Sequence, residues 1–157
     1  MEKDYLNIEI TEMTADDIPA LSLLEKECFR EPWSENAFIY ELTNKNALFL
    51  TAKNQTEILG YIGSHLVLDE CYITNIAVCS DYRRKGVAKR LIYELLKILQ
   101  NKNASFATLE VRKSNKEAVA LYEKLGFTLS GTIKNGSQKP LEDTIIYTLT
   151  LNGGDDR

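Results

Sequence analysis

The pattern of residues 71–111 limits the folds open to this chain more than any other feature. A strand pattern at 71–79 is followed by a long helix at about 86–101 and by a second strand at 105–111. The helix carries an apolar stripe at helical spacing, formed by Val87, Leu91, Leu95 and Ile98. A strand, a helix and a strand in succession typically make a crossover between parallel strands. The run therefore predicts a mixed α/β sheet.

The rest of the chain supplies further strands and helices. Strand patterns cover residues 5–13, 47–53, 57–67, 127–133 and 143–151. Helix patterns cover 18–28, after a capping pair of Thr14 and Asp17, and 35–44, after a Ser34 cap. A third helix, 115–124, begins with a capping box of Ser114 and Glu117 and ends at Gly126. We expect an α/β fold with a central, mostly antiparallel sheet, one parallel crossover and helices on both faces.

Length and composition favour a soluble globular protein with one domain. The chain has 157 residues, and we expect a single domain over 1–151 with a disordered tail at 152–157. The net charge of −4 and the pI of about 5.1 argue against general binding of nucleic acid. Its N-terminus does not resemble a signal peptide, and no apolar run approaches the roughly 20 residues of a membrane helix. A cytoplasmic protein that does not bind membranes is therefore expected.

Few residues could hold a metal ion. The three cysteines, Cys28, Cys71 and Cys79, do not have the spacing of a metal site, and we expect reduced structural thiols. The single histidine, His65, lies in a strand pattern. We therefore expect no metal.

The segment SDYRRKGVAKRL, residues 80–91, crowds positive charge into one turn of an acidic chain. Gly86 lies where a strand has ended and the long helix begins, and the first amides of a helix have no internal partners. Those amides and the helix dipole stabilise a phosphate group. Exposed cations at a helix N-terminus cost about 0.3–1 kcal/mol each without an anion. This favours a phosphate site over a solvated loop or a nucleic-acid patch.

The residues around that turn resemble a known family. The run NIAVCSDYRRKGVAKRLI is similar to the acetyl-CoA-binding motif of the GNAT N-acetyltransferase superfamily, R/Q-x-x-G-x-G/A, with Arg83, Gly86 and Ala88 at its named positions. A second signature, LEVRKSNKEAVALYEKLGF, occupies 109–127. With EPWSENAF at 31–38 and LEDTII at 141–146, nearly the whole chain resembles the RimI-type ribosomal-protein-alanine N-acetyltransferases.

This resemblance implies a cofactor, acetyl-CoA, and the residues that hold it. The backbone of Ile76, Ala77 and Val78 would pair with the pantetheine arm as an added strand does. The pyrophosphate would be held by the amides of Arg84, Lys85, Gly86, Val87, Ala88 and Lys89, with Arg83 beside them. Asn115 would bond to the pantetheine or its thioester end.

The resemblance also implies the catalytic groups: Glu110 as the base and Tyr122 as the acid. Asn115 and Tyr122 are two helical turns apart and share a face. Without the resemblance, core packing would explain Tyr122 and a surface position would explain Glu110. A glutamate with its usual pKa of about 4.3 is a weak base for an amine, so we expect a raised pKa or action through water.

The acceptor is less closely specified. The resemblance implies acetylation of a protein N-terminal amine, namely the N-terminal alanine of a small-subunit ribosomal protein. It also places the Pro32–Trp33 corner beside the acceptor peptide, although a packed corner explains that segment as well. Where the RimI pattern has an adjacent tyrosine pair, this chain has Gly136 and Ser137. The alternatives are acetylation of a small-molecule amine, such as a polyamine or antibiotic, and a non-catalytic CoA-binding module.

Overall fold

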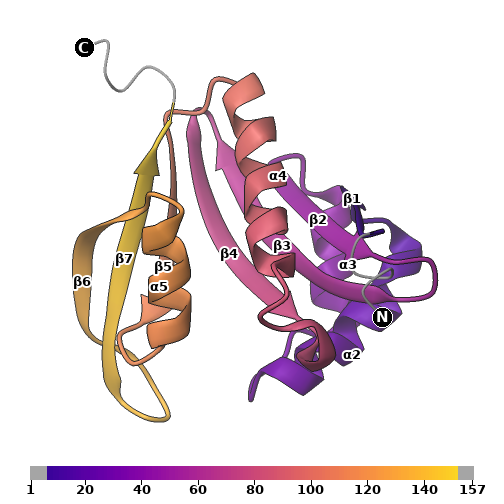
Figure 1. Cartoon of the computed structure of the whole chain (residues 1–157), viewed down its shortest axis with the longest axis horizontal. Helices are drawn as coiled ribbons and strands as arrows, with labels where there is room; N and C mark the ends of the chain where they lie inside the picture. The colour runs from indigo at the N-terminus through magenta and orange to yellow at the C-terminus, as the bar shows by residue number, and fades with distance from the viewer. Residues whose placement is uncertain (1–6, 152–157) are drawn as a thin grey trace. The chain divides into compact units, whose positions relative to one another are not determined.

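The computed structural model describes residues 7–151 of the chain. Its strands are β1 (Glu9–Glu12), β2 (Ala47–Lys53), β3 (Ile58–Val67), β4 (Glu70–Val78), β5 (Phe106–Arg112), β6 (Thr128–Ser137) and β7 (Glu142–Thr150) (Figure 1). Its helices are α2 (Ile18–Cys28), α3 (Glu35–Thr43), α4 (Val87–Asn101) and α5 (Lys116–Lys124), with 3-10 turns η1 (Ala15–Asp17) and η2 (Ser80–Tyr82). The start of the strand predicted at 5–13 and the tail predicted at 152–157 lie outside the described residues.

The described strands form one mixed sheet in the order β1-β2-β3-β4-β5-β7-β6. The pairs β1–β2, β2–β3, β5–β7 and β6–β7 are antiparallel. The pair β4–β5 is parallel, and α4 connects its two strands. This confirms the mixed sheet and the parallel crossover predicted from residues 71–111.

Contacts between residues group the chain into two compact units. In the described range, the first unit comprises residues 7–65 and 75–98, and the second comprises 66–74 and 99–151. The single domain predicted for 1–151 stays a prediction, and each unit is described by itself below.

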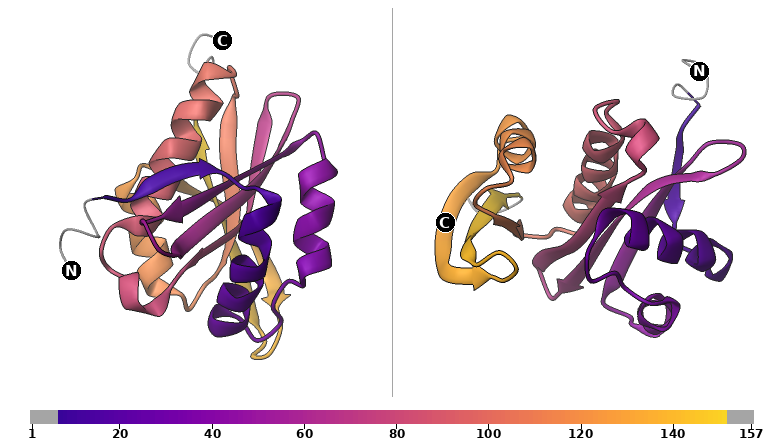
Figure 2. Two further views of the ribbon diagram at one scale, coloured as in Figure 1. Left: turned by 90° about the vertical axis from the view of Figure 1, so that its right-hand side faces the viewer. Right: turned by 90° about the horizontal axis from the view of Figure 1, so that it is seen from below.

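In the first unit, α4 covers one face of the strands, and α2 and α3 cover the other (Figure 2). Three members of the apolar stripe of α4 are buried, since Val87 is 1% exposed and Leu91 and Leu95 are 0% exposed, while Ile98 is half-buried. On the opposite face, a cluster of buried side chains joins α2 and α3 to β2, β3 and β4; its members are Ile18, Leu21, Leu24, Phe38, Phe49, Tyr61 and Ala77. The predicted placement of helices on both faces is thus confirmed.

The helix starts of the first unit are those expected from the sequence. Asp17 accepts a hydrogen bond from the Thr14 N–H at 2.9 Å and pairs with Lys53 Nζ at 2.8 Å. Ser34 caps α3 by accepting the Ala37 N–H at 3.2 Å. Both caps satisfy amides that the helix itself leaves without partners.

In the second unit, the predicted cap of α5 is wrong by one residue. Asn115, not Ser114, is the N-cap, and its Oδ1 accepts the Ala118 N–H at 3.2 Å. Ser114 instead donates both its N–H and its hydroxyl to Glu142, each at 2.9 Å. Since Glu142 is 28 residues away in the chain, the local S-x-x-E pattern could not reveal this competing partner.

The strand β6 is longer than the predicted 127–133, because the hairpin with β7 continues to the pair Ser137 and Glu142. The hydroxyls of Ser137 and Thr144 hydrogen-bond at 2.5 Å, and the Asn135 N–H donates to Asp143 Oδ1 at 2.9 Å. These cross-strand bonds hold residues 134–137 in the sheet although they lack an apolar alternation.

Candidate active site

The predicted phosphate turn lies between η2 and α4 in the first unit. Arg84 and Gly86 have positive φ angles of 62° and 84°. Backbone that alternates in this way turns successive N–H groups toward one side and makes an anion-binding concavity. The Gly86 carbonyl accepts the Arg90 N–H at 3.0 Å, which is the first bond of the helix. The amides of Val87, Ala88 and Lys89 therefore have no acceptor within the helix, and they form the positive end of its dipole.

The cations of this turn do not act as one group. The Arg83 guanidinium donates to the Val78 carbonyl at 3.1 Å and to Cys28 Sγ at 3.2 Å. It therefore braces the turn against β4 and α2. Lys85 Nζ lies 5.6 Å from the centre of the Tyr82 ring, and Lys89 Nζ lies 5.7 Å from the centre of the Tyr93 ring.

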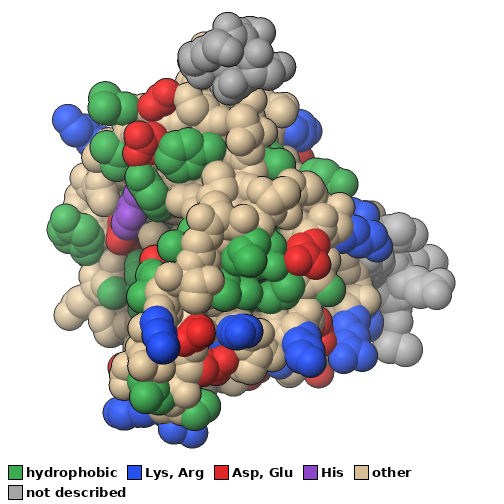
Figure 3. Space-filling view, turned by 90° about the vertical axis from the view of Figure 1, so that its left-hand side faces the viewer, with side chains coloured by type: hydrophobic (Ala, Val, Ile, Leu, Met, Phe, Trp, Pro, Cys, Tyr) green, Lys and Arg blue, Asp and Glu red, His purple; other side chains and the backbone are tan. Residues whose placement is uncertain are grey.

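Charge elsewhere on the surface is mixed. On the described part of the face in Figure 3, lysine and arginine side chains lie interspersed with aspartate and glutamate. That surface has no single sign of charge, unlike the turn before α4.

The end of β4 carries the predicted strand-addition segment. The parallel ladder between β4 and β5 runs from the pair Glu70–Phe106 to the pair Ile73–Leu109, so residues 76–78 lie beyond its end. The side chain of Ala77 is buried, while Ile76 is half-buried. A Cβ on Gly60 would lie 2.7 Å from the Ala77 carbonyl oxygen, so the glycine permits this close approach of β3 to β4.

Glu110 lies in the second unit, on β5 opposite Ile146 of β7. Its neighbours Leu109 and Val111 are 5% and 8% exposed, whereas Glu110 is exposed. The alternation predicted for this strand is therefore confirmed, and it leaves the Glu110 carboxylate accessible from solvent.

Asn115 is the N-cap of α5, and Tyr122 lies within that helix, in the same unit. Tyr122 is 6% exposed, and its ring centre lies 5.9 Å from that of Phe127. Burial raises the pKa of Tyr122 to about 12. The ring therefore packs in the core of this unit, and its hydroxyl stays protonated.

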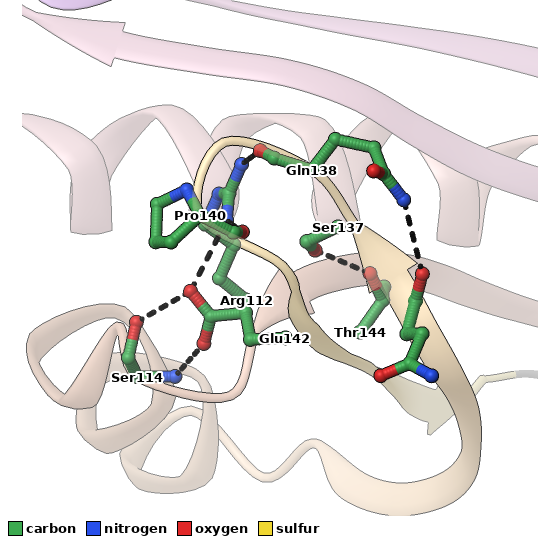
Figure 4. Close-up of polar contacts among 8 residues, drawn as sticks. Arg112, Ser114, Ser137, Gln138, Pro140, Glu142 and Thr144 are labelled. Atoms are coloured by element: carbon green, nitrogen blue, oxygen red, sulfur yellow. Dashed lines mark hydrogen bonds and ion pairs between the residues drawn. The ribbon is translucent and has the colours of Figure 1, made fainter.

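A polar network that the sequence did not predict joins β5, the start of α5 and the β6–β7 hairpin (Figure 4). Arg112 Nη1 donates to Glu142 at 3.1 Å and to the Pro140 carbonyl at 2.9 Å, and Nη2 donates to the Gln138 carbonyl. The N–H and hydroxyl of Ser114 and the Arg112 guanidinium lower the pKa of Glu142. The network thus holds the hairpin against the segment between Glu110 and Asn115.

The corner between α2 and α3 is packed. The Trp33 ring centre lies 5.3 Å from that of Phe38 and 6.0 Å from that of Phe49. Packing of this corner was one of the two interpretations of the sequence, and the ring contacts agree with it.

The described residues lack the features of two other classes of protein. No group of three or more histidine, cysteine, aspartate and glutamate side chains within 7–151 could hold a metal ion. No helix in the same range is both long enough and apolar enough to cross a membrane.

Comparisons with known proteins define the class. The model of the acetyltransferase (GNAT) family matches residues 18–127. The chain belongs to this family and is a GNAT N-acetyltransferase with the GNAT fold. Proteins of the family use acetyl-CoA.

Among its relatives is the ribosomal protein bS18-alanine N-acetyltransferase of Escherichia coli (strain K12), 33% identical over 146 residues, which covers 91% of this chain and 97% of the relative. A Bacillus subtilis (strain 168) protein, provisionally named for the same activity, is 33% identical over 144 residues, covering 91% of this chain and 95% of the relative. The crystal structure of the E. coli ribosomal-protein-S18-alanine N-acetyltransferase matches with a TM-score of 0.85 at 32% identity, over 92% of this chain and 94% of that chain. The resemblance found in the sequence is therefore confirmed.

Proposed function

We propose that the protein acetylates the N-terminal alanine of ribosomal protein bS18 in the cytoplasm, with acetyl-CoA as donor. The observation that carries this proposal is the similarity to bS18-alanine N-acetyltransferases over 91% of the chain. The E. coli structure of that name supports it, because the match covers nearly all of both chains.

The residues before α4 fit a diphosphate. The amides of Val87, Ala88 and Lys89 have no helical acceptor, and the positive φ angles of Arg84 and Gly86 curve the turn around them. Bound acetyl-CoA supplies an activated acetyl thioester. In the proposal, Arg83 keeps the turn in place through the Val78 carbonyl, and the backbone of Ile76, Ala77 and Val78 pairs with the pantetheine arm.

The amine must lose a proton before it can attack. An N-terminal amine has a pKa of about 7.7–8.0 and lysine about 10.4, so neutralising lysine costs roughly 3 kcal/mol more. A modest base is therefore sufficient for an N-terminus. The exposed Glu110 is proposed as that base, either directly or through water.

Tyr122 is proposed to stabilise the departing thiolate. Its side chain is 6% exposed and its pKa is about 12, so the hydroxyl remains protonated at neutral pH. Asn115 Oδ1 caps α5, so the side-chain NH₂ is the group proposed to contact the pantetheine or thioester end.

One observation favours the small-molecule alternative. A Cβ at Gly136 would lie 2.8 Å from Thr144 Oγ1, and Ser137 is 9% exposed with its hydroxyl bonded to Thr144. This stretch of the hairpin is therefore closely packed where the RimI pattern has two tyrosines. An acceptor surface built without those rings would suit a smaller amine.

The test is acetylation of a peptide panel beside free polyamines. Peptides with the bS18 N-terminal sequence and with altered first residues are incubated with acetyl-CoA, and mass spectrometry locates the acetyl group. The proposal predicts acetylation at the α-amine and a preference for alanine first. Turnover of polyamines with inert peptides would overturn the proposed acceptor, and absence of turnover with any amine would favour a CoA-binding module.

A further inference from the structure

A buried carboxylate without a role in the proposed chemistry lies in the first unit. Glu25 of α2 is 1% exposed. Its Oε2 accepts a hydrogen bond from the Tyr61 hydroxyl at 2.5 Å, and its Oε1 accepts the Trp33 N–H at 2.9 Å. Buried carboxylates are costly unless they are hydrogen-bonded, and both oxygens of Glu25 meet this condition.

Tyr61 of β3 connects this carboxylate to β4. It is 0% exposed, and burial, followed by the hydrogen bond to Glu25, raises its pKa above the usual range. The hydroxyl therefore stays protonated and donates a hydrogen bond to Glu25. The side chain of Asn75 on β4 lies beside the same hydroxyl and acts in the opposite direction on its pKa. Glu25 and Tyr61 thus form a buried pair next to the Asn75 amide.

Asn75 Oδ1 is the unsatisfied member of this chain of contacts. The atom is shielded from solvent and has no hydrogen-bond partner within residues 7–151. Buried acceptors are nearly always paired, and an exception calls for a specific cause such as a missing ligand. The rest of Asn75 is half-buried, so the side chain borders the surface.

The position of Asn75 on β4 suggests the class of donor. It lies beyond the Ile73–Leu109 end of the β4–β5 ladder and immediately before the backbone proposed to pair with pantetheine. Its side chain shares a strand face with Ala77, which packs with residues of α2 and α3. Glu25, beside it, accepts the Trp33 N–H. Trp33 lies in the corner that the sequence resemblance placed next to the acceptor peptide.

We propose that Asn75 binds the acceptor amine, with Oδ1 accepting one of its N–H groups, and that Tyr61 and Glu25 act as positioning residues. This inference rests on the proposed function. A neutral primary amine has two N–H donors and one lone pair. Holding one N–H on Asn75 orients the nitrogen and leaves the lone pair free for attack.

The experiment compares Asn75→Ala with the wild type in steady-state kinetics. The KM for the acceptor peptide should rise about tenfold, while the KM for acetyl-CoA stays within about twofold, because only the acceptor loses a hydrogen bond. Asn46→Ala makes the same change in an exposed turn and should alter neither constant. Tyr61→Phe retains Asn75 but removes its positioning hydroxyl, and it should raise the acceptor KM by a smaller factor.

Binding of acetyl-CoA, measured by titration calorimetry, verifies that each variant is folded. If Asn75→Ala does not fold, Tyr61→Phe decides the question by the same two KM values. An unchanged acceptor KM overturns the inference, and so does a rise confined to acetyl-CoA, which would assign Oδ1 to the cofactor.

The role of Asn75 can be tested even if the proposed acceptor, bS18, is wrong. If the wild type does not acetylate bS18 peptides, the kinetics are measured with the primary amine that it does acetylate. The same split between the two KM values then supports or overturns the role of Asn75.

Discussion

Replacing Tyr122 by phenylalanine removes one hydroxyl group and leaves the buried ring in place. The ring contributes the packing against Phe127, and phenylalanine retains that ring. The substitution therefore preserves the packing of the core. The free energy of unfolding should change by less than about 1 kcal/mol.

The magnitude of the kinetic effect follows from the pKa of about 12. A thiol has a pKa of about 8.5, so transfer of the tyrosine proton to a thiolate is uphill by roughly 5 kcal/mol. A hydrogen bond to a developing charge is worth about 1.5–3 kcal/mol without such a transfer. Loss of that bond should lower kcat by about 10- to 150-fold. Full acid catalysis would instead contribute about 10²–10⁴-fold.

Steady-state release of coenzyme A thiol at saturating peptide measures kcat, and calorimetry measures acetyl-CoA affinity, which should change little. Tyr147→Phe is the matched control, because its hydroxyl donates to Glu123 at 2.8 Å in the same unit. It should lower stability and spare kcat. An unchanged kcat for Tyr122→Phe would remove Tyr122 from the mechanism. A loss beyond about 10³-fold would refute the hydrogen-bond argument and restore proton transfer.

Three further changes test the other parts of the site. Glu110→Gln should flatten the acidic limb of the pH–rate profile, and a limb that persists would identify another base. Gly86→Val should abolish acetyl-CoA binding in calorimetry, because a branched side chain is strained at a φ of 84° and would crowd the amides; normal heat would contradict the phosphate site. Glu142→Gln should destabilise the protein in urea more at pH 7 than at pH 3. The lowered pKa of Glu142 means that its contribution is present above the unfolded-state pKa of about 4.5 and is lost as pH falls through the lower folded value. An equal loss at both pH values would show that the charge is not responsible.

The elements that sequence reasoning located best are those set by local pattern. The stripe of α4 and the alternation around Glu110 depend only on neighbours along the chain, and both agree with the structure. The Ser34 cap is also local. The turn between η2 and α4 could be located for the same reason, since Gly86 and its neighbours are contiguous, while its binding of phosphate stays a prediction.

Contacts between distant residues could not be predicted in this way. Glu25 and Tyr61 are 36 residues apart, and neither has a neighbouring residue that indicates a buried pair. The Ser114 cap failed because Glu142, remote in the chain, takes its hydrogen-bonding groups. The role of Arg83 as a brace also depends on a remote residue, Cys28.

The contact between Arg83 and Cys28 has a practical consequence for labelling and for enzyme assays. The half-buried Cys28 sulfur accepts a hydrogen bond from the Arg83 guanidinium at 3.2 Å and lies 3.6 Å from the Val78 carbonyl oxygen. A maleimide dye or an aromatic disulfide reagent attached there would displace the guanidinium and release the turn before α4. Colorimetric detection of coenzyme A should therefore be done on acid-quenched aliquots, and fluorophores are better introduced at a surface residue of a Cys28→Ser background.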